Sequence, residues 1–446
     1  MKSKNRVAII GGGLSGSECA ALLLRMGIEV TLYEMRPKRF TEAHKTEYLS
    51  ELVCSNSLKS NDRSSPQGLL KEEMRHLGSL IIESADANSL PAGESLSVDR
   101  ILFSRYITER LTAHSNFRLI REEIGEIGEI SKEYDALVIA SGPLTTSGLL
   151  NSLKSFFPQE NLLYFYDAIS PIVSFDSIDM NYAFFGSRYN KGKDDYINCP
   201  LDKNVYDQLY NAILSAELYS PHIDEDLRFF EGCLPIEEIA MRGYKSLSFG
   251  PFKPVGFGFD KKDMPYAVVQ LRRENRAGTL YSLVAFQTRM KYGSQERVLR
   301  LIPALKNCEI VRYGQMHRNI YLDSPSVLNR SLSLVSNNRV FVAGTLSGVE
   351  GYVEAAASGM LVALSVRSLL DNKEFEPPPD MTAMGLLYRY IVGDLKIGKH
   401  FAPTNINKGL FLHNGEKRYH ERLAGDAIER FEEYSSAIKN SLLISA

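Results

Sequence analysis

The sequence predicts an α/β fold in which a Rossmann-type nucleotide-binding domain, discontinuous in sequence, carries an inserted α+β domain. Three observations support this prediction. The apolar run at residues 6–10 enters a glycine-rich turn, two later apolar runs at residues 134–140 and 339–343 also lead into glycine, and alternating stretches lie between these two. Because strands buried on both faces of a parallel sheet are continuously apolar, the three runs are expected to share one sheet.

The N-terminal segment has the pattern of a βαβ unit. After the strand at residues 6–10, apolar residues recur at helical spacing over residues 14–26, and Gly27 stands where a helix would end. Residues 29–34 then alternate as a second strand that closes on Glu34. Strand, glycine turn, helix, strand and terminal acid within about 30 residues form a dinucleotide-binding fingerprint.

Later strands and breaks divide the chain into four predicted segments. Antiparallel strands are expected at residues 266–270 and 279–286, and a proline-rich break at residues 376–380 follows a helix expected at residues 355–370. The predicted segments are residues 1–174 (first part of the nucleotide-binding domain), 175–324 (inserted substrate domain), 325–375 (completing segment) and 376–446 (C-terminal helical appendage).

The composition favours a soluble, cytoplasmic protein. A chain of 446 residues with 44% hydrophobic content can bury a large core, and a net charge of -2 excludes a global attraction to polyanions. Residues 1–5 lead directly into the first strand without a signal-peptide core, and apolar runs stay below the roughly 18 to 20 residues that span a bilayer. The five cysteines and eight histidines show no metal-ligand spacing, so no metal site is expected.

The glycine turn is the first candidate binding site. Gly11, Gly13 and Gly16 form a G-x-G-x-x-G pattern. The first glycine permits the tight turn, the second lets backbone amides approach a pyrophosphate, and the third lets the helix pack on the strand. Glu34 is placed to accept hydrogen bonds from an adenosine ribose, which favours FAD or NAD over a 2′-phosphorylated cofactor. A structural turn that binds nothing is the alternative.

A late glycine-rich segment favours FAD over NAD. Residues 344–352 combine a strand end with a helix start that is placed to hold the ribityl or pyrophosphate part of FAD, although a plain turn is the alternative. No second G-x-G-x-x-G occurs, so a nicotinamide reductant would dock without its own Rossmann domain. The predicted cofactor-binding residues are Gly11, Gly12, Gly13, Leu14, Ser15, Gly16, Glu34, Arg36, Gly344, Gly348, Val349, Glu350, Gly351 and Tyr352.

Several blocks in order along the chain resemble one enzyme family. They include Glu34-Met-Arg-Pro37 and residues 51–58, 68–74, 229–236, 312–319 and 348–352. In these blocks the chain closely resembles the methylenetetrahydrofolate-tRNA-(uracil-5-)-methyltransferases, the flavin-dependent makers of ribothymidine in the tRNA T-loop. It departs from the usual residues of that family at Gly12, Ser15, Tyr292 and Thr345.

The resemblance implies folate-dependent methylation of uracil carbon 5 in RNA. FAD, reduced by NAD(P)H, would carry a methylene from 5,10-methylenetetrahydrofolate to the uracil and complete the methyl with a hydride. The T-loop uridine of tRNA is the expected target, and a ribosomal RNA uridine is the alternative, since a related subgroup acts on ribosomal RNA. A generic FAD/NAD(P)H oxidoreductase and a non-catalytic RNA-binding protein are the competing function classes.

This chemistry needs a nucleophile at uracil carbon 6, and a thiolate suits that step. Cys233, in an expected rigid turn between Gly232 and Pro235, is the first candidate, and Cys54 is the second. Buried packing is the alternative for both, and is expected for Cys19, Cys199 and Cys308. Basic residues near these loops are expected to neutralise RNA phosphates, with solvated surface charge as the alternative: Arg36, Lys38, Arg39, Lys59, Arg242, Lys245 and Lys253. Tyr352 and His317 are candidates for stacking on a pterin or flavin ring.

Overall fold

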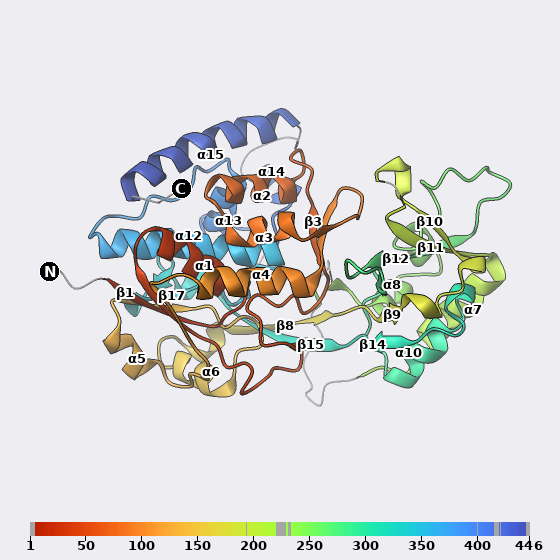
Figure 1. Cartoon of the computed structure of the whole chain (residues 1–446), viewed down its shortest axis with the longest axis horizontal. Coiled ribbons are helices and arrows are strands. Elements are labelled where there is room, and N and C mark those ends of the chain that lie inside the picture. Colours follow the sequence, from red (N-terminus) through yellow and green to blue (C-terminus); the bar gives the residue numbers. More distant parts are fainter. Residues whose placement is uncertain are drawn as a thin grey trace.

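The computed structural model describes residues 5–192, 194–219, 229–230, 233–398, 400–413, 419 and 421–442. A six-stranded sheet forms the centre of one lobe (Figure 1). Its strands, in order across the sheet, are β16 (Ser333–Leu334), β17 (Asn337–Val342), β7 (Ala136–Ile139), β1 (Arg6–Ile10), β2 (Glu29–Tyr33) and β6 (Phe117–Ile120). All neighbours are parallel except β16 and β17. Because residues 6–10 and 337–342 share this sheet, the predicted discontinuous Rossmann-type domain is confirmed.

The central strand β1 is apolar and buried along most of its length, as its position inside the sheet requires. Val7, Ala8 and Ile9 of β1 are fully buried, and β1 pairs on both sides, with β2 and with β7. Helices therefore cover both faces, as parallel strands of this composition require.

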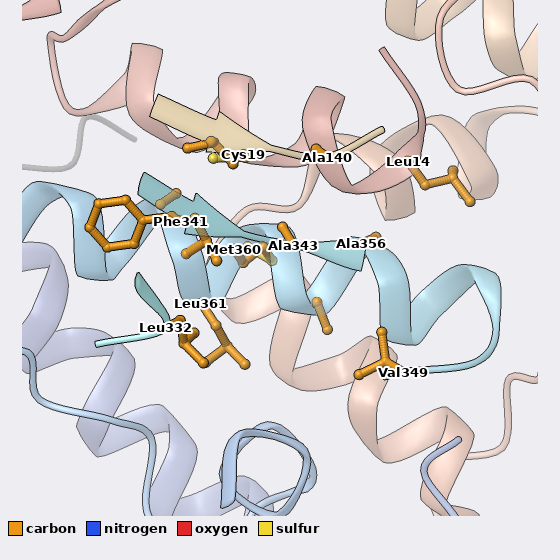
Figure 2. Close-up of a cluster of buried hydrophobic side chains, with 14 of the residues drawn as sticks. Leu14, Cys19, Ala140, Leu332, Phe341, Ala343, Val349, Ala356, Met360 and Leu361 are labelled. Atoms are coloured by element: carbon orange, nitrogen blue, oxygen red, sulfur yellow. The ribbon is translucent and has the colours of Figure 1, made fainter. Parts of the chain in front are cut away.

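Two helices, α1 (Leu14–Arg25) and α12 (Tyr352–Leu370), pack closely against each other beside the sheet. Gly359 makes the contact possible, because a Cβ there would stand 2.2 Å from the carbonyl oxygen of Ser15. Figure 2 shows Cys19 of α1 and Met360 of α12 within one apolar cluster. In the described part of the chain, α12 is the one helix long and apolar enough to cross a membrane, but 83% of its apolar window is buried inside the protein.

A second sheet forms the core of the other lobe (Figure 1). Its strands, in order, are β10 (Phe184–Gly186), β11 (Tyr196–Leu201), β12 (Ala267–Arg273), β13 (Leu280–Leu283), β9 (Ile172–Ser174) and β14 (Ile310–Arg312), and all neighbours are antiparallel. The helices of this lobe are α7 (Lys203–Leu214), α8 (Ile236–Met241), α9 (Ser246–Phe249) and α10 (Tyr292–Leu299). This lobe confirms the expected inserted α+β architecture. β9 joins its sheet although it precedes residue 175, and the domain limits themselves stay a prediction.

A two-stranded antiparallel ribbon, β8 (Leu162–Ala168) with β15 (Met316–Leu322), runs between the two lobes (Figure 1). The remaining elements belong to the first lobe: the small sheet β3 (Ser57–Ser60), β5 (Ser95–Val98) and β4 (Ser89–Leu90), and the helices α2 (Pro66–His76), α3 (Leu80–Ala87), α4 (Arg100–Thr112), α5 (Ile127–Glu133), α6 (Ser147–Leu153), α11 (Ser324–Val327), α13 (Ala383–Ile391), α14 (Lys408–His413) and α15 (Glu421–Leu442). Phe411 and Phe431 of the C-terminal helices are fully buried in the same core as the first sheet.

Candidate active site

A cavity of about 430 Å³ opens where the carboxyl ends of β1, β2 and β7 meet the N-terminus of α1. Nucleotides bind at this edge in open parallel sheets. The predicted site residues that line the cavity are Gly11, Gly12, Gly13, Leu14, Ser15, Glu34, Arg36, Cys54, Cys233, Glu350, Gly351 and Tyr352. The fold thus brings three separate parts of the chain together at one place.

Four predicted cofactor residues lie behind this lining: Gly16, Gly344, Gly348 and Val349. At Gly16 a Cβ would stand 1.9 Å from the carbonyl oxygen of Gly11, so only glycine allows the helix to pack this closely on the turn. At Gly348 a Cβ would meet the ring of Phe401 at 2.3 Å. These positions support the cavity wall, and direct contact of these residues with a cofactor stays a prediction.

The glycine turn leaves the start of α1 open to the cavity. Gly11 has a φ of +107°, and a Cβ there would stand 2.4 Å from the carbonyl oxygen of Ala140, so only glycine fits. A Cβ on Gly13 would meet no described atom within 4 Å, and no side chain of the described residues caps the helix N-terminus. Unpaired N–H groups and the helix dipole therefore face a space that fits a pyrophosphate.

Glu34 follows β2 and is held by a buried ion-pair network. Its Oε2 accepts hydrogen bonds from the Gly12 amide at 3.0 Å and from Arg36 Nη2 at 3.1 Å. Arg36 also donates to Glu51 at 3.1 Å. Burial opposes ionisation of Glu34, but Arg36 and the two amide donors hold its pKa below the usual value. Both oxygens of Glu34 are already engaged, since Oε1 also accepts hydrogen bonds from the Arg36 amide and from Arg36 Nε, each at 3.0 Å. A ribose hydroxyl would therefore have to share a Glu34 oxygen with Gly12 or Arg36.

Both candidate thiols line the cavity. The Cys54 amide donates a hydrogen bond of 2.7 Å to the Tyr352 hydroxyl, and the Cys54 thiol faces the carbonyl oxygen of Ala168 at 3.9 Å. The Cys233 thiol lies 3.8 Å from Glu350 Oε1. Burial, followed by the charge of Asp167, raises the pKa of Cys54 to about 12, and burial likewise raises the pKa of Cys233. Either thiol therefore needs a proton acceptor to become a nucleophile near neutral pH.

Neither thiol is deep in apolar packing, in contrast with the other described cysteines. Cys19, Cys199 and Cys308 are buried in the cores of the two lobes, as predicted. Glu231 and Gly232, on which the expectation of a rigid turn before Cys233 depended, lie outside the described residues.

A charged cluster forms the cavity wall beside Cys233. The Lys59 ammonium lies 3.6 Å from Glu350 Oε2 and 3.7 Å from Glu354 Oε1. Burial raises the pKa of Glu350 to about 7, Lys59 opposes this rise, and Glu354 adds to it. No sequence pattern predicts that Lys59 and Glu354 meet here, because the two positions are far apart in the chain.

Two further polar residues support the site without having been predicted. Asp167 of β8 lines the cavity, and its Oδ1 has no hydrogen-bond partner among the described residues. Burial raises the pKa of Asp167, against the effect of His317, its register partner on β15. Arg100 donates to the carbonyl oxygens of Leu52 and Cys54 at 2.7 and 2.8 Å and so fixes the loop that carries Cys54. His317 itself is buried and does not line the cavity.

The predicted phosphate-neutralising residues fall into two groups. The prediction is wrong for Arg36, which is 2% exposed and pairs with Glu34 and Glu51, since a guanidinium buried between two carboxylates cannot reach a backbone phosphate. Lys59 pairs with Glu350 and Glu354 in the charged cluster, and Arg39 pairs with Glu123 at 2.6 Å. By contrast, the Lys245 ammonium lies 5.8 Å from the ring centre of Phe249, which is 74% exposed on the second lobe. Lys253 follows Phe249 by four residues in the chain.

In the part of the chain that the structure describes, no three His, Cys, Asp or Glu side chains are grouped so as to hold a metal ion.

The parallel sheet and the open glycine turn at its carboxyl edge define a Rossmann-type dinucleotide-binding protein. Residues 6–374 match the family model of glucose inhibited division protein A. Two relatives named methylenetetrahydrofolate-tRNA-(uracil-5-)-methyltransferase TrmFO, from Exiguobacterium sp. and Bacillus pumilus, are each 46% identical over 439 residues, 97% of this chain and 99% of the relative. The chain therefore belongs to the glucose inhibited division protein A family and, within it, to the TrmFO methyltransferases.

A solved structure agrees with this fold. GidA of Aquifex aeolicus superposes with a TM-score of 0.71 at 16% identity, over 99% of this chain and 75% of that protein. At this identity the likeness concerns the fold alone.

Proposed function

We propose that this chain binds FAD and methylates carbon 5 of a uracil in RNA, with 5,10-methylenetetrahydrofolate as the carbon donor and NAD(P)H as the reductant. The T-loop uridine of tRNA is the proposed target, since the names of the relatives specify the uracil of a tRNA, and the cytoplasm is the proposed setting. One observation carries the proposal: Cys54 and Cys233 line the same cavity as the glycine turn. A nucleophile for uracil thus faces the place where a dinucleotide fits.

The cavity walls fit FAD. The pyrophosphate would lie against the open N-terminus of α1, at the space left by Gly13, and the adenosine ribose would lie near Glu34. When bound, FAD supplies the redox chemistry that carries a one-carbon unit and completes it to a methyl group.

The residues of the chain have distinct roles in this proposal. Cys233 is the proposed nucleophile: its thiolate forms a bond to uracil carbon 6, which makes carbon 5 nucleophilic, and the same bond breaks at the end of the reaction. Cys54 is the second thiol, held in place by Tyr352 and Arg100. Both thiols are partly exposed to the cavity, where a uracil ring could reach them.

An exposed surface on the second lobe is the proposed RNA-contacting region. The stretch from residue 239 to residue 259 contains no acidic residue but includes Arg242, Lys245 and Lys253. The Lys245 ammonium lies 5.8 Å from the ring centre of the exposed Phe249. Cations paired with an exposed aromatic ring suit phosphates and an unstacked base. α8, which leads into this surface, begins three residues after Cys233. The proposed RNA-contacting residues therefore follow the proposed nucleophile closely in the sequence.

One assay separates the candidate functions. The FAD-loaded chain is incubated with NADPH, methylenetetrahydrofolate and either unmodified tRNA or ribosomal RNA, and 5-methyluridine is measured by mass spectrometry. Product in tRNA supports the proposal, and product only in ribosomal RNA changes the target. NADPH oxidation that requires neither RNA nor folate favours a generic oxidoreductase, whereas RNA binding without any turnover favours a non-catalytic protein.

A further inference from the structure

The charged cluster of Lys59, Glu350 and Glu354 has a composition that packing alone does not explain. Two carboxylates face one ammonium at the cavity wall. Asp167 of β8 also acts on Glu350, and Lys71 of α2 also acts on Glu354, so three carboxylates meet two ammonium groups. The ammonium nitrogen is covered although 35% of the Lys59 side chain is exposed, and Glu354 is fully buried. A buried carboxylate whose charge is not balanced tends to bind a proton. The cluster is therefore a place where a proton can be held inside the cavity.

The polar atoms of this cluster are incompletely bonded. Glu354 Oε1 accepts a hydrogen bond from the Ile406 amide at 3.1 Å. Within the described residues, the Lys59 ammonium, Glu350 Oε2 and Glu354 Oε2 have no hydrogen-bond partner. Unsatisfied buried groups are rare in folded proteins and require an explanation. Proton exchange with a neighbouring group is one that the geometry supports.

Special backbone positions build the cluster. Lys59 is a non-glycine residue with a φ of +63°, in the left-handed region that side chains rarely adopt. Gly351 has a φ of +109°, and a Cβ there would stand 2.2 Å from Glu354 Oε2 and 2.9 Å from the Lys59 ammonium. The chain thus adopts a costly conformation at one position and keeps glycine at another, and both bring the charged groups together.

The neighbour of this cluster is the proposed nucleophile. Glu350 Oε1 lies 3.8 Å from the Cys233 thiol, while Glu350 Oε2 lies 3.6 Å from the ammonium. We propose that Glu350 accepts the thiol proton of Cys233 and that Lys59 positions Glu350 for this transfer. The S–H bond breaks, an O–H bond forms on the carboxylate, and the electron pair stays on sulfur. The proton moves from one group of the cavity wall to another, so the total charge of the wall does not change. The step therefore requires no exchange of a proton with solvent.

The inference depends on the proposed function only for the identity of the carbon that the thiolate attacks. Its test therefore uses no RNA and no folate. In the FAD-loaded full chain, the rate of Cys233 alkylation by iodoacetamide is measured from pH 5.5 to 9 by peptide mass spectrometry. Cys54, in the same digest, is the internal reference. Failure of the methylation assay and failure of this test are then distinguishable.

The expected result is a rise in the alkylation rate of Cys233 as pH passes through about 7, where Glu350 loses its proton. Glu350→Gln removes this rise and slows alkylation at pH 7.5 by about a hundredfold, within the range known for general-base assistance. Glu350→Asp keeps the rise at an intermediate rate. If Glu350 instead acts only through its negative charge, Glu350→Gln will leave the rate unchanged or increase it, and this result would overturn the proposal.

Glu354→Gln is the matched variant, since it makes the same chemical change on the other carboxylate that faces Lys59. Removing the charge of Glu354 lowers the pKa of Glu350, because Glu354 helps to raise it. The rise in alkylation rate is therefore retained, with its midpoint at lower pH. If Glu350→Gln does not retain FAD, the midpoint of the Cys233 alkylation rate in Glu354→Gln still tests the proposal. A shift of this midpoint to lower pH supports the proposal, and an unchanged midpoint contradicts it.

Discussion

The Cys54 amide donates a hydrogen bond of 2.7 Å to the Tyr352 hydroxyl, and this bond joins the loop after the first βαβ unit to the first residue of α12. Two parts of the chain separated by 298 positions therefore fix one thiol of the cavity. Neither the loop nor the helix start would hold Cys54 in this position alone.

Tyr352→Phe is expected to reduce the methylation rate about tenfold while FAD stays bound. The change leaves the Cys54 amide without its acceptor, and an unsatisfied buried donor costs about 1–3 kcal/mol. Tyr388→Phe is the matched control, because its hydroxyl donates to the carbonyl oxygen of Arg330 at 2.8 Å away from the cavity lining. Single-turnover methylation and flavin absorbance are measured for both. Equal rates in the two variants would show that the hydrogen bond does not position the thiol.

Alanine at Gly13 and at Gly16 is expected to have different effects. A Cβ on Gly13 meets open space, so the FAD-free protein keeps its melting temperature, but the methyl group occupies the place of the pyrophosphate and weakens FAD binding. A Cβ on Gly16 stands 1.9 Å from the Gly11 carbonyl oxygen, so the turn has to move and both stability and FAD binding fall. Thermal unfolding without FAD and titration with FAD separate the two effects. A lower melting temperature of FAD-free Gly13→Ala would contradict the finding that a Cβ at Gly13 meets open space.

The carboxylate of Glu34 is expected to stabilise the fold at neutral pH and to lose this effect in acid. The pKa of Glu34 is lowered in the folded state from an ordinary value of 4.5, so the unfolded chain takes up the proton first as pH falls. The difference in unfolding free energy between the wild type and Glu34→Gln is therefore constant well above pH 4.5 and shrinks below it. Urea unfolding from pH 7 to 3.5 measures this difference, with the exposed Glu109→Gln as control. A difference that grows in acid would contradict the prediction.

The local parts of the site could be predicted from sequence, and the parts that depend on distant contacts could not. The glycine turn, the strands beside it and Glu34 follow from residue spacing within one βαβ unit, because adjacent residues fix that geometry. The cluster of Lys59, Glu350 and Glu354 joins β3 to the start of α12, and no spacing rule links those positions. In the same way, Arg36 has the composition of a phosphate ligand, and only the fold shows that two carboxylates enclose it.

Phe249→Ala is expected to weaken RNA binding about tenfold and to leave FAD binding unchanged. Stacking of one base on an aromatic ring is worth about 1–3 kcal/mol. Val335→Ala is the control, since Val335 is also strongly exposed, at 68%, but lies in the first lobe between β16 and β17. Binding of unmodified tRNA is measured at fixed salt for both variants. An equal effect of the two changes would exclude Phe249 as a base-stacking residue.

The origin of the transferred carbon tests the central claim most directly. The FAD-loaded chain, tRNA lacking 5-methyluridine and NADPH are combined with methylenetetrahydrofolate whose methylene carbon is labelled with ¹³C, and the nucleosides are analysed by mass spectrometry. We predict one labelled methyl group on uracil carbon 5 with the wild type and none with Cys233→Ala, which keeps its flavin. Absence of labelled 5-methyluridine from the FAD-loaded wild type, with tRNA and with ribosomal RNA alike, would contradict the account.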